Sequence, residues 1–171
     1  MKRALIVHGW ESASNEHWYQ EEKKALEKLG YVVTAPNMPN SFHPDKEEWV
    51  NVITHFAPDE DSVLIGHSLG APAILRYLEK TDKKVGKIFL VAGFASDLGF
   101  NETRKFVIDP FDWDKIKQNV EEIFVLNQID DPWVPFAVGA EMAKNLSVEI
   151  VKVDGNNHFD TMDLDLINKE L

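Results

Sequence analysis

The residues best suited to do chemistry form the pentapeptide Gly66-His67-Ser68-Leu69-Gly70. It matches the G-x-S-x-G pattern, in which a serine occupies a sharp turn between a strand and a helix. An apolar run over 63–65 precedes the motif and a helical pattern over 71–78 follows it. Glycines two places before and after the serine avoid a Cβ clash in so tight a turn. The pattern predicts that Ser68 is a nucleophile at the amino end of a helix, where free N–H groups favour negative charge.

A serine hydroxyl is a weak nucleophile until a base takes its proton. We call this sharp turn, with the serine at its tip, the nucleophile elbow. In chains that have it, the acid and then the histidine follow the serine. Only one histidine, His158, lies beyond Ser68, in a polar loop over 154–158 that follows the last expected strand. The sequence therefore predicts His158 as the base.

The acid that orients the base is expected on the loop over 127–135, where two aspartates compete. The spacing Asp-x-x-Val, common at this place in chains with the elbow, fits Asp131 followed by Val134. We therefore predict Asp131 as the acid and Asp130 as a turn or capping residue. Asp97, Asp154 or a site without an acid stay open as alternatives.

The negative oxygen formed during attack needs two backbone N–H donors. We predict that they belong to Leu69, directly after the nucleophile, and to Trp10, on the loop after the first strand. Six further residues are expected to line the substrate pocket, with the two histidines flanking it and carrying no chemistry: His8, Gly9, His67, Phe94, Trp133 and Phe159.

The bulk properties narrow the function classes. The formal net charge of −11 over 171 residues disfavours nucleic acid and anionic membranes, which are held by clustered Lys and Arg. The absence of cysteine excludes disulfides, zinc–thiolate sites and a cysteine nucleophile. The histidines show no metal-ligand spacing, and we expect neither metal nor cofactor. No apolar run approaches the ~20 residues of a spanning helix, and the apolar stretch after Arg3 is too short for a signal peptide. We expect a cytoplasmic protein acting on a small molecule, with its oligomeric state left open.

Strand-like runs alternate with helical patterns along the chain, which is typical of an α/β fold with a parallel sheet. We expect one domain over 1–171, with six parallel strands in the order 2-1-3-4-5-6 and helices on both faces. The order reverses between the first and third strands, and ligands bind at such a switch point. The expected strands cover 3–8, 31–35, 62–67, 87–92, 123–126 and 148–153. The expected helices cover 14–29, 44–56, 69–79, 112–118 and 136–145, with a last one from about 160.

The segment over 93–119 is long for a connection between a strand and a helix. It contains four phenylalanines and a tryptophan. Two interpretations stay open, a lid over the site and an irregular crossover.

Scattered short matches, together with the elbow, resemble a known family: His8-Gly9, His17-Trp18, Asn37-Met38-Pro39, Ser96-Asp97-Leu98-Gly99, Asp131-Pro132 and His158-Phe159. The chain is similar over nearly its whole length to the small serine hydrolases of the α/β-hydrolase superfamily, which include YdeN-type bacterial proteins and retinoblastoma-binding protein 9. The resemblance implies a compact α/β-hydrolase fold without a large cap and a triad of Ser68, Asp131 and His158. It says little about the substrate.

We expect a carboxylesterase acting on small esters through an acyl-enzyme, because so short a chain has little room for a peptide-selecting domain. A serine peptidase stays open as an alternative. So does a non-catalytic binding protein on the same scaffold, because fold alone does not give function.

Overall fold

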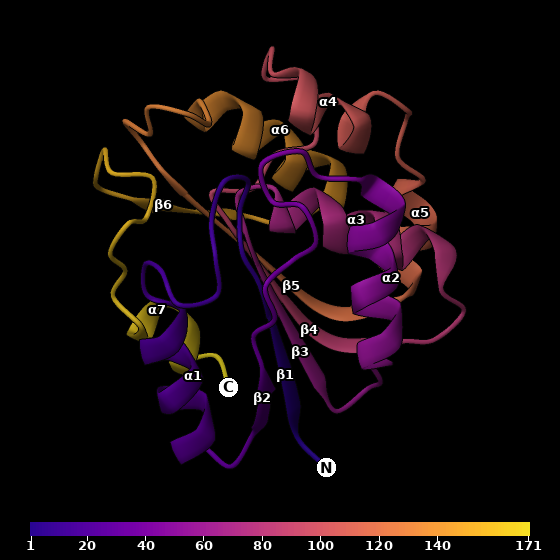
Figure 1. The fold of residues 1–171 in the computed structure, drawn as a ribbon, viewed down its shortest axis with the longest axis vertical. Coiled ribbons are helices and arrows are strands. Elements are labelled where there is room, and N and C mark those ends of the chain that lie inside the picture. The colour runs from indigo at the N-terminus through magenta and orange to yellow at the C-terminus, as the bar shows by residue number, and fades with distance from the viewer.

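The computed structural model describes residues 1–171 and contains one six-stranded sheet (Figure 1). Its strand order is β2-β1-β3-β4-β5-β6, and every neighbouring pair is parallel. The strands are β1 (Arg3–Val7), β2 (Val32–Thr34), β3 (Ser62–His67), β4 (Val85–Val91), β5 (Val120–Gln128) and β6 (Ile150–Val153). The predicted order and direction of the strands are confirmed.

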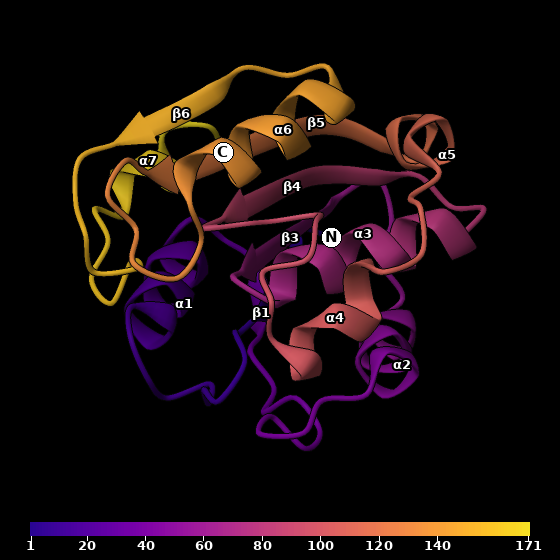
Figure 2. The ribbon, with the colours of Figure 1, turned by 90° about the horizontal axis from the view of Figure 1, so that it is seen from above.

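Seven helices cover the two faces of the sheet (Figure 2). They are α1 (Tyr19–Lys28), α2 (Lys46–Phe56), α3 (Gly70–Lys80), α4 (Asn101–Val107), α5 (Trp113–Gln118), α6 (Phe136–Leu146) and α7 (Asp165–Asn168). Successive side chains of a strand point to opposite faces, so β1 contributes to two hydrophobic cores. Leu5 and Val7 pack in the core shared with α2 to α6, whereas Ala4 and Ile6 pack in the core shared with α1 and α7.

Several predicted boundaries are wrong, each for a local reason. The first helix begins at Tyr19 rather than near Ser14, because the preceding residues form turns and His17 has a left-handed backbone. The second begins at Lys46, where the Asp45 carboxylate accepts hydrogen bonds from two backbone N–H groups of the first turn. The last helix is the short α7, which begins only at Asp165.

The strand β5 begins earlier than predicted, because Val120 already pairs with Val85 of β4. The charged pair Glu121 and Glu122 conceals this start in the sequence. Both carboxylates are exposed and form ion pairs with lysines on β4 or just before it.

The segment 93–119 forms two helices, α4 and α5, that pack beside α3. Phe106 of α4 and Ile116 of α5 are fully buried in the larger core. Arg76 of α3 is buried, and its guanidinium donates to the carbonyls of Phe106, Asp109 and Pro110. Most of this segment is therefore a crossover fixed to the core.

Candidate active site

The turn between β3 and α3 carries Ser68 with φ of 52°, a conformation that residues with a Cβ rarely adopt. A Cβ on Gly66 would lie 2.7 Å from the Gly70 carbonyl carbon. This is the clash predicted for the positions two places before and after the serine. A Cβ on Gly70 would instead clash with the Val7 carbonyl of β1. The elbow is thus closed on two sides, and Ser68 is half-buried at its tip.

His158 and Asp131 lie together at the carboxyl ends of the last two strands. The Nδ1 atom of His158 is 2.8 Å from Asp131 Oδ2 and 3.0 Å from Oδ1, and the Asp131 side chain is fully buried. An ionised carboxylate only accepts hydrogen bonds, so Nδ1–H donates and Nε2 is left free to accept a proton. The pair therefore has the arrangement of a base with its orienting acid.

Two backbone N–H groups, those of Trp133 and Val134, also donate to Asp131 Oδ1, each at 2.9 Å. Burial alone raises the pKa of Asp131. The hydrogen bonds from His158 and from the two amides outweigh burial, and the net effect lowers the pKa below its ordinary value. Asp131 is therefore held as a carboxylate.

The competing aspartates lie elsewhere. Asp130 and Asp154 are exposed, and Asp97 binds Arg104 at 2.7 Å. The structure pairs His158 with Asp131 alone among these four.

Of the two predicted oxyanion donors, Leu69 directly follows Ser68 and Trp10 directly follows Gly9, which lies close to the serine. A Cβ on Gly9 would lie 3.1 Å from Ser68 Cβ and 3.7 Å from its Oγ, so the loop after β1 passes directly over the nucleophile. Neither the N–H of Trp10 nor that of Leu69 donates a hydrogen bond to another backbone group. Both N–H groups are therefore free of backbone partners, and their role as oxyanion donors stays a prediction.

Four of the predicted pocket residues fall into two groups in the structure. Gly9 contacts Ser68, and Trp133 is 57% exposed on the loop of Asp131. Phe94 and Phe159, in contrast, are each only 1% exposed and pack in the two cores. These two aromatic rings fill the interior and offer almost no surface to a substrate.

His8 and His67 are both buried and both serve as hydrogen-bonding supports. His8 donates from Nδ1 to the Gly9 carbonyl and accepts the Met38 N–H at Nε2, each at 2.8 Å. Burial lowers the pKa of His8, which keeps the ring neutral for this double role. His67 bridges Tyr19 and the backbone of His158.

Sequence reasoning missed Phe100 as a neighbour of Trp10 and Trp133. Its ring lies 5.4 Å from that of Trp10 and 6.3 Å from that of Trp133, so three aromatic rings from three loops form one rim. We call these three residues the aromatic rim. The crowding of aromatics over 93–119 was the available signal, but it did not identify which ring would lie beside Trp10 and Trp133.

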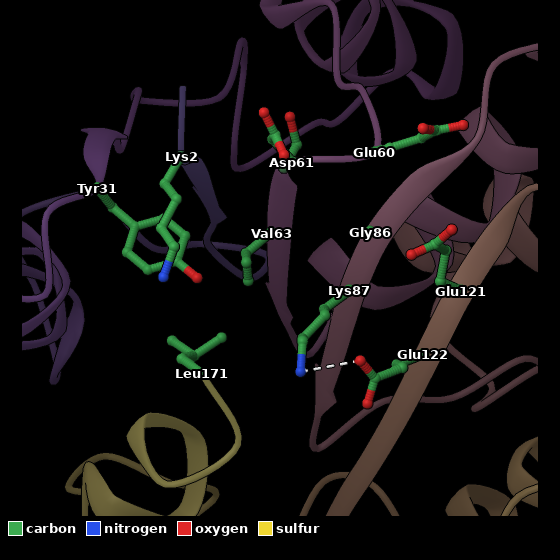
Figure 3. Close-up of a pocket in the computed structure, with 11 residues that line it drawn as sticks. Lys2, Tyr31, Glu60, Asp61, Val63, Gly86, Lys87, Glu121, Glu122 and Leu171 are labelled. Carbon is green, nitrogen blue, oxygen red and sulfur yellow. Dashed lines mark ion pairs between the residues drawn. The ribbon is translucent and has the colours of Figure 1, made fainter.

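A cavity of about 190 Å³ lies at the opposite end of the sheet (Figure 3). Lys2, Tyr31, Lys87 and Leu171 line it among other residues, and Lys87 forms an ion pair with Glu122 at 2.9 Å. The cavity contains none of the predicted site residues.

Nowhere do three His, Asp or Glu side chains gather in a group that could hold a metal ion. None of the seven helices combines the length and the apolar composition that spanning a membrane requires.

Comparison with known proteins gives a consistent family. The model of the family described as serine hydrolase matches residues 4–163. YdeN of Bacillus subtilis (strain 168) is 34% identical over 163 residues, covering 92% of this chain and 86% of YdeN. Serine hydrolase RBBP9 of Rattus norvegicus is 32% identical over 163 residues, covering 92% of this chain and 87% of RBBP9.

Solved structures agree with the sequence matches. The crystal structure of the ydeN gene product from B. subtilis superposes with a TM-score of 0.88 at 33% identity, covering 93% of this chain and 88% of that one. Est1E from Butyrivibrio proteoclasticus, solved with ferulic acid, has a TM-score of 0.78 at 14% identity, covering 99% and 86%. The second likeness shows the shared fold alone. The predicted resemblance to the serine hydrolases is confirmed.

Proposed function

Because this chain belongs to the serine hydrolase family, we propose that it is a carboxylesterase that cleaves small esters with Ser68, His158 and Asp131 as its catalytic triad. One observation carries the proposal. A buried, ionised Asp131 binds Nδ1 of the only histidine that follows the elbow serine, at 2.8 Å. This arrangement supports a base whose Nε2 faces outward from its acid.

The proposed reaction runs through an acyl-enzyme. Ser68 Oγ attacks the ester carbonyl while His158 Nε2 takes the hydroxyl proton, and the N–H groups of Leu69 and Trp10 hold the oxyanion. The alkoxide leaves with the proton from His158. Water then attacks the acyl-enzyme and gives a proton to His158. His158 returns this proton to Ser68 Oγ as the acyl–oxygen bond breaks, which releases the carboxylic acid and free Ser68.

The aromatic rim supports a small, apolar acyl group. Trp10 continues the loop that passes over Ser68, and Trp133 continues the loop of Asp131. Each acyl methylene that the rings cover contributes about 0.8 kcal/mol. Carbons beyond the rim stay in water or clash with it, so kcat/KM is expected to rise over the first few acyl carbons and then fall.

The test is a screen of p-nitrophenyl esters of increasing acyl length, with matched amides and thioesters, in the wild type and in Ser68→Ala. Ester hydrolysis and fluorophosphonate labelling should both be lost in Ser68→Ala, with the circular dichroism spectrum unchanged. Undiminished labelling in that variant would refute Ser68 as the nucleophile. A steady rise to long-chain esters would refute the size limit. Faster cleavage of amides than of esters would favour a peptidase, and a wild type that neither labels nor cleaves would favour a binding protein.

A further inference from the structure

We propose that two buried side chains, Gln128 and His67, act as positioning residues that hold the loop of His158 in the conformation from which this histidine works as a base. The inference rests on the proposed function, because it gives His158 that role. We call Gln128 and His67 together the loop clamp. Neither touches the reacting atoms; both bind the backbone around the base.

The loop needs such support because its backbone is strained. His158 and Phe159 have φ of 54° and 55°, and both carry a Cβ. Two consecutive left-handed residues of this kind persist only where the surrounding structure fixes them. Asp131 holds the His158 ring, but a bond to the ring leaves the backbone free to relax.

Gln128, at the end of β5, binds both neighbours of His158. Its buried Oε1 accepts the N–H of Asn157 at 3.2 Å and that of Phe159 at 3.3 Å. Its Nε2 donates to the Asn157 side-chain oxygen at 2.7 Å. A Cβ on Gly155 would lie 2.5 Å from that Nε2, so the loop fits closely around the amide. One side chain thus binds the backbone N–H groups of the residues on both sides of the base.

His67 binds the carbonyl of His158 itself. Its Nε2 lies 2.9 Å from the His158 carbonyl oxygen, and its Nδ1 lies 2.5 Å from the Tyr19 hydroxyl. A neutral ring that donates from Nε2 and accepts at Nδ1 satisfies both partners. Burial, more than any other factor, lowers the pKa of His67 well below its ordinary value and favours this neutral form.

Other titratable groups also face His67 from the elements around it. The His17 ring is 5.8 Å away and pairs with Asp160 at 3.2 Å, and His8 lies on the loop after β1. The His158 ring is 4.9 Å away. None of these groups replaces the bond from His67 to the His158 carbonyl.

The clamp and Asp131 then have separate tasks. Asp131 selects the tautomer of the His158 ring, and the clamp fixes the backbone to which that ring is attached. A displacement of about 1 Å in a catalytic group can cost about 100-fold in rate. Loss of the clamp is therefore expected to slow proton transfer and to leave substrate binding at the aromatic rim unaltered.

The experiment compares Gln128→Met, His67→Leu and His67→Gln in the full chain, using p-nitrophenyl acetate and a fluorophosphonate. We expect the first two variants to lose roughly 10- to 100-fold in kcat, with KM within about twofold, and to label at proportionally lower rates. His67→Gln keeps an N–H donor for the His158 carbonyl and should recover most of the loss. The double variant Gln128→Met with His67→Leu should lose less than the product of the single losses, because both residues hold one loop.

Tyr19→Phe gives a second, gentler variant that removes only the hydroxyl behind His67. We expect a threefold to tenfold fall in kcat, on the order of one hydrogen bond, and no fall in the matched Tyr77→Phe, whose hydroxyl is bound to Thr81 away from the site. The clamp is overturned if KM rises while kcat is unchanged, or if His67→Gln is as slow as His67→Leu. Equal labelling rates in wild type and variants would overturn the clamp and leave the proposed function standing. A wild type that never labels would overturn both.

Discussion

Two carboxyl groups are buried in this molecule, Asp131 on the loop after β5 and Glu22 on α1, and their surroundings differ. Asp131 accepts hydrogen bonds from His158 and two backbone N–H groups. Glu22 is fully buried, with only a long contact of 3.5 Å from Asn168 Nδ2 to one oxygen and no partner for the other.

The pKa values of these two groups move in opposite directions. Burial raises both, but the hydrogen bonds of Asp131 reverse the effect and its pKa is lowered. The single weak contact from Asn168 does not reverse it at Glu22, and burial raises the pKa of Glu22 from about 4.5 to about 7. Hydrogen-bond partners, more than burial, thus separate a buried carboxyl group that stays ionised from one that folding tends to neutralise.

The largest expected effect comes from replacing the Asp131 carboxylate by a neutral amide. In Asp131→Asn, the two backbone N–H groups that bind Oδ1 should keep the amide oxygen, which turns the NH₂ toward His158 Nδ1. His158 must then carry its proton on Nε2, where it cannot accept one from Ser68. We expect kcat to fall by about 10⁴, as for other triads, measured on p-nitrophenyl acetate.

The matched control is Asp130→Asn, at an exposed neighbour that contributes only its backbone to the loop of His158. Its kcat should stay within about threefold of the wild type, as for surface changes away from a site. If Asp130→Asn were nearly inactive and Asp131→Asn remained active, the orienting acid would be Asp130 and not Asp131.

Local sequence patterns predicted part of the fold and of the candidate site. The sheet order and the elbow follow from local patterns of apolar runs and glycines, and the structure has both. The helix α4 was missed because Phe100, at its start, offers no side-chain cap.

Contacts between distant segments leave little trace in a single sequence. The bonds that bring Gln128 to Asn157 and Tyr19 to His67 join residues 29 and 48 positions apart. Phe94 and Phe159 were misassigned to the pocket for the same reason, because an aromatic near a strand end can point into the core or toward the site. The burial of Glu22 leaves no local trace in the sequence, because its neighbour Glu21 on α1 has the same side chain and is exposed.

The next effect concerns Glu22 and the dependence of the free energy of unfolding on pH. Its pKa is higher in the folded state, so the native protein binds a proton that the unfolded chain has released between about pH 4.5 and 7. Stability from this group is fully present below pH 4.5 and is lost as the pH rises through 7. At 1.36 kcal/mol per pKa unit the loss is up to about 3 kcal/mol.

Glu22→Gln should remove that loss, because the amide resembles the protonated acid. In urea unfolding, the variant should be more stable than the wild type at pH 8 by roughly 1–3 kcal/mol and similar to it at pH 5. The control Glu21→Gln, at an exposed neighbour on α1, should shift neither value by more than about 0.5 kcal/mol. Equal gains at both pH values would show that the charge of Glu22 is not the cause.

The smallest expected effect tests whether even a weak partner acts in the direction seen at Asp131. The hydrogen bond from Asn168 favours the charged form of Glu22 and so lowers its pKa. In Asn168→Ala the carboxylate loses this donor, and its pKa should rise further. The free energy of unfolding should fall at pH 8 by about 0.5–1 kcal/mol, less than for a bond to a charged group at ideal distance, because 3.5 Å is long. At pH 5, where Glu22 is protonated in the folded state, the loss should be smaller. Asn51→Ala, at an exposed position of α2, controls for the loss of a helical asparagine and should show no such pH dependence. A loss in Asn168→Ala that is equal at pH 5 and pH 8 would mean that Asn168 serves the packing of α7 and not the charge of Glu22.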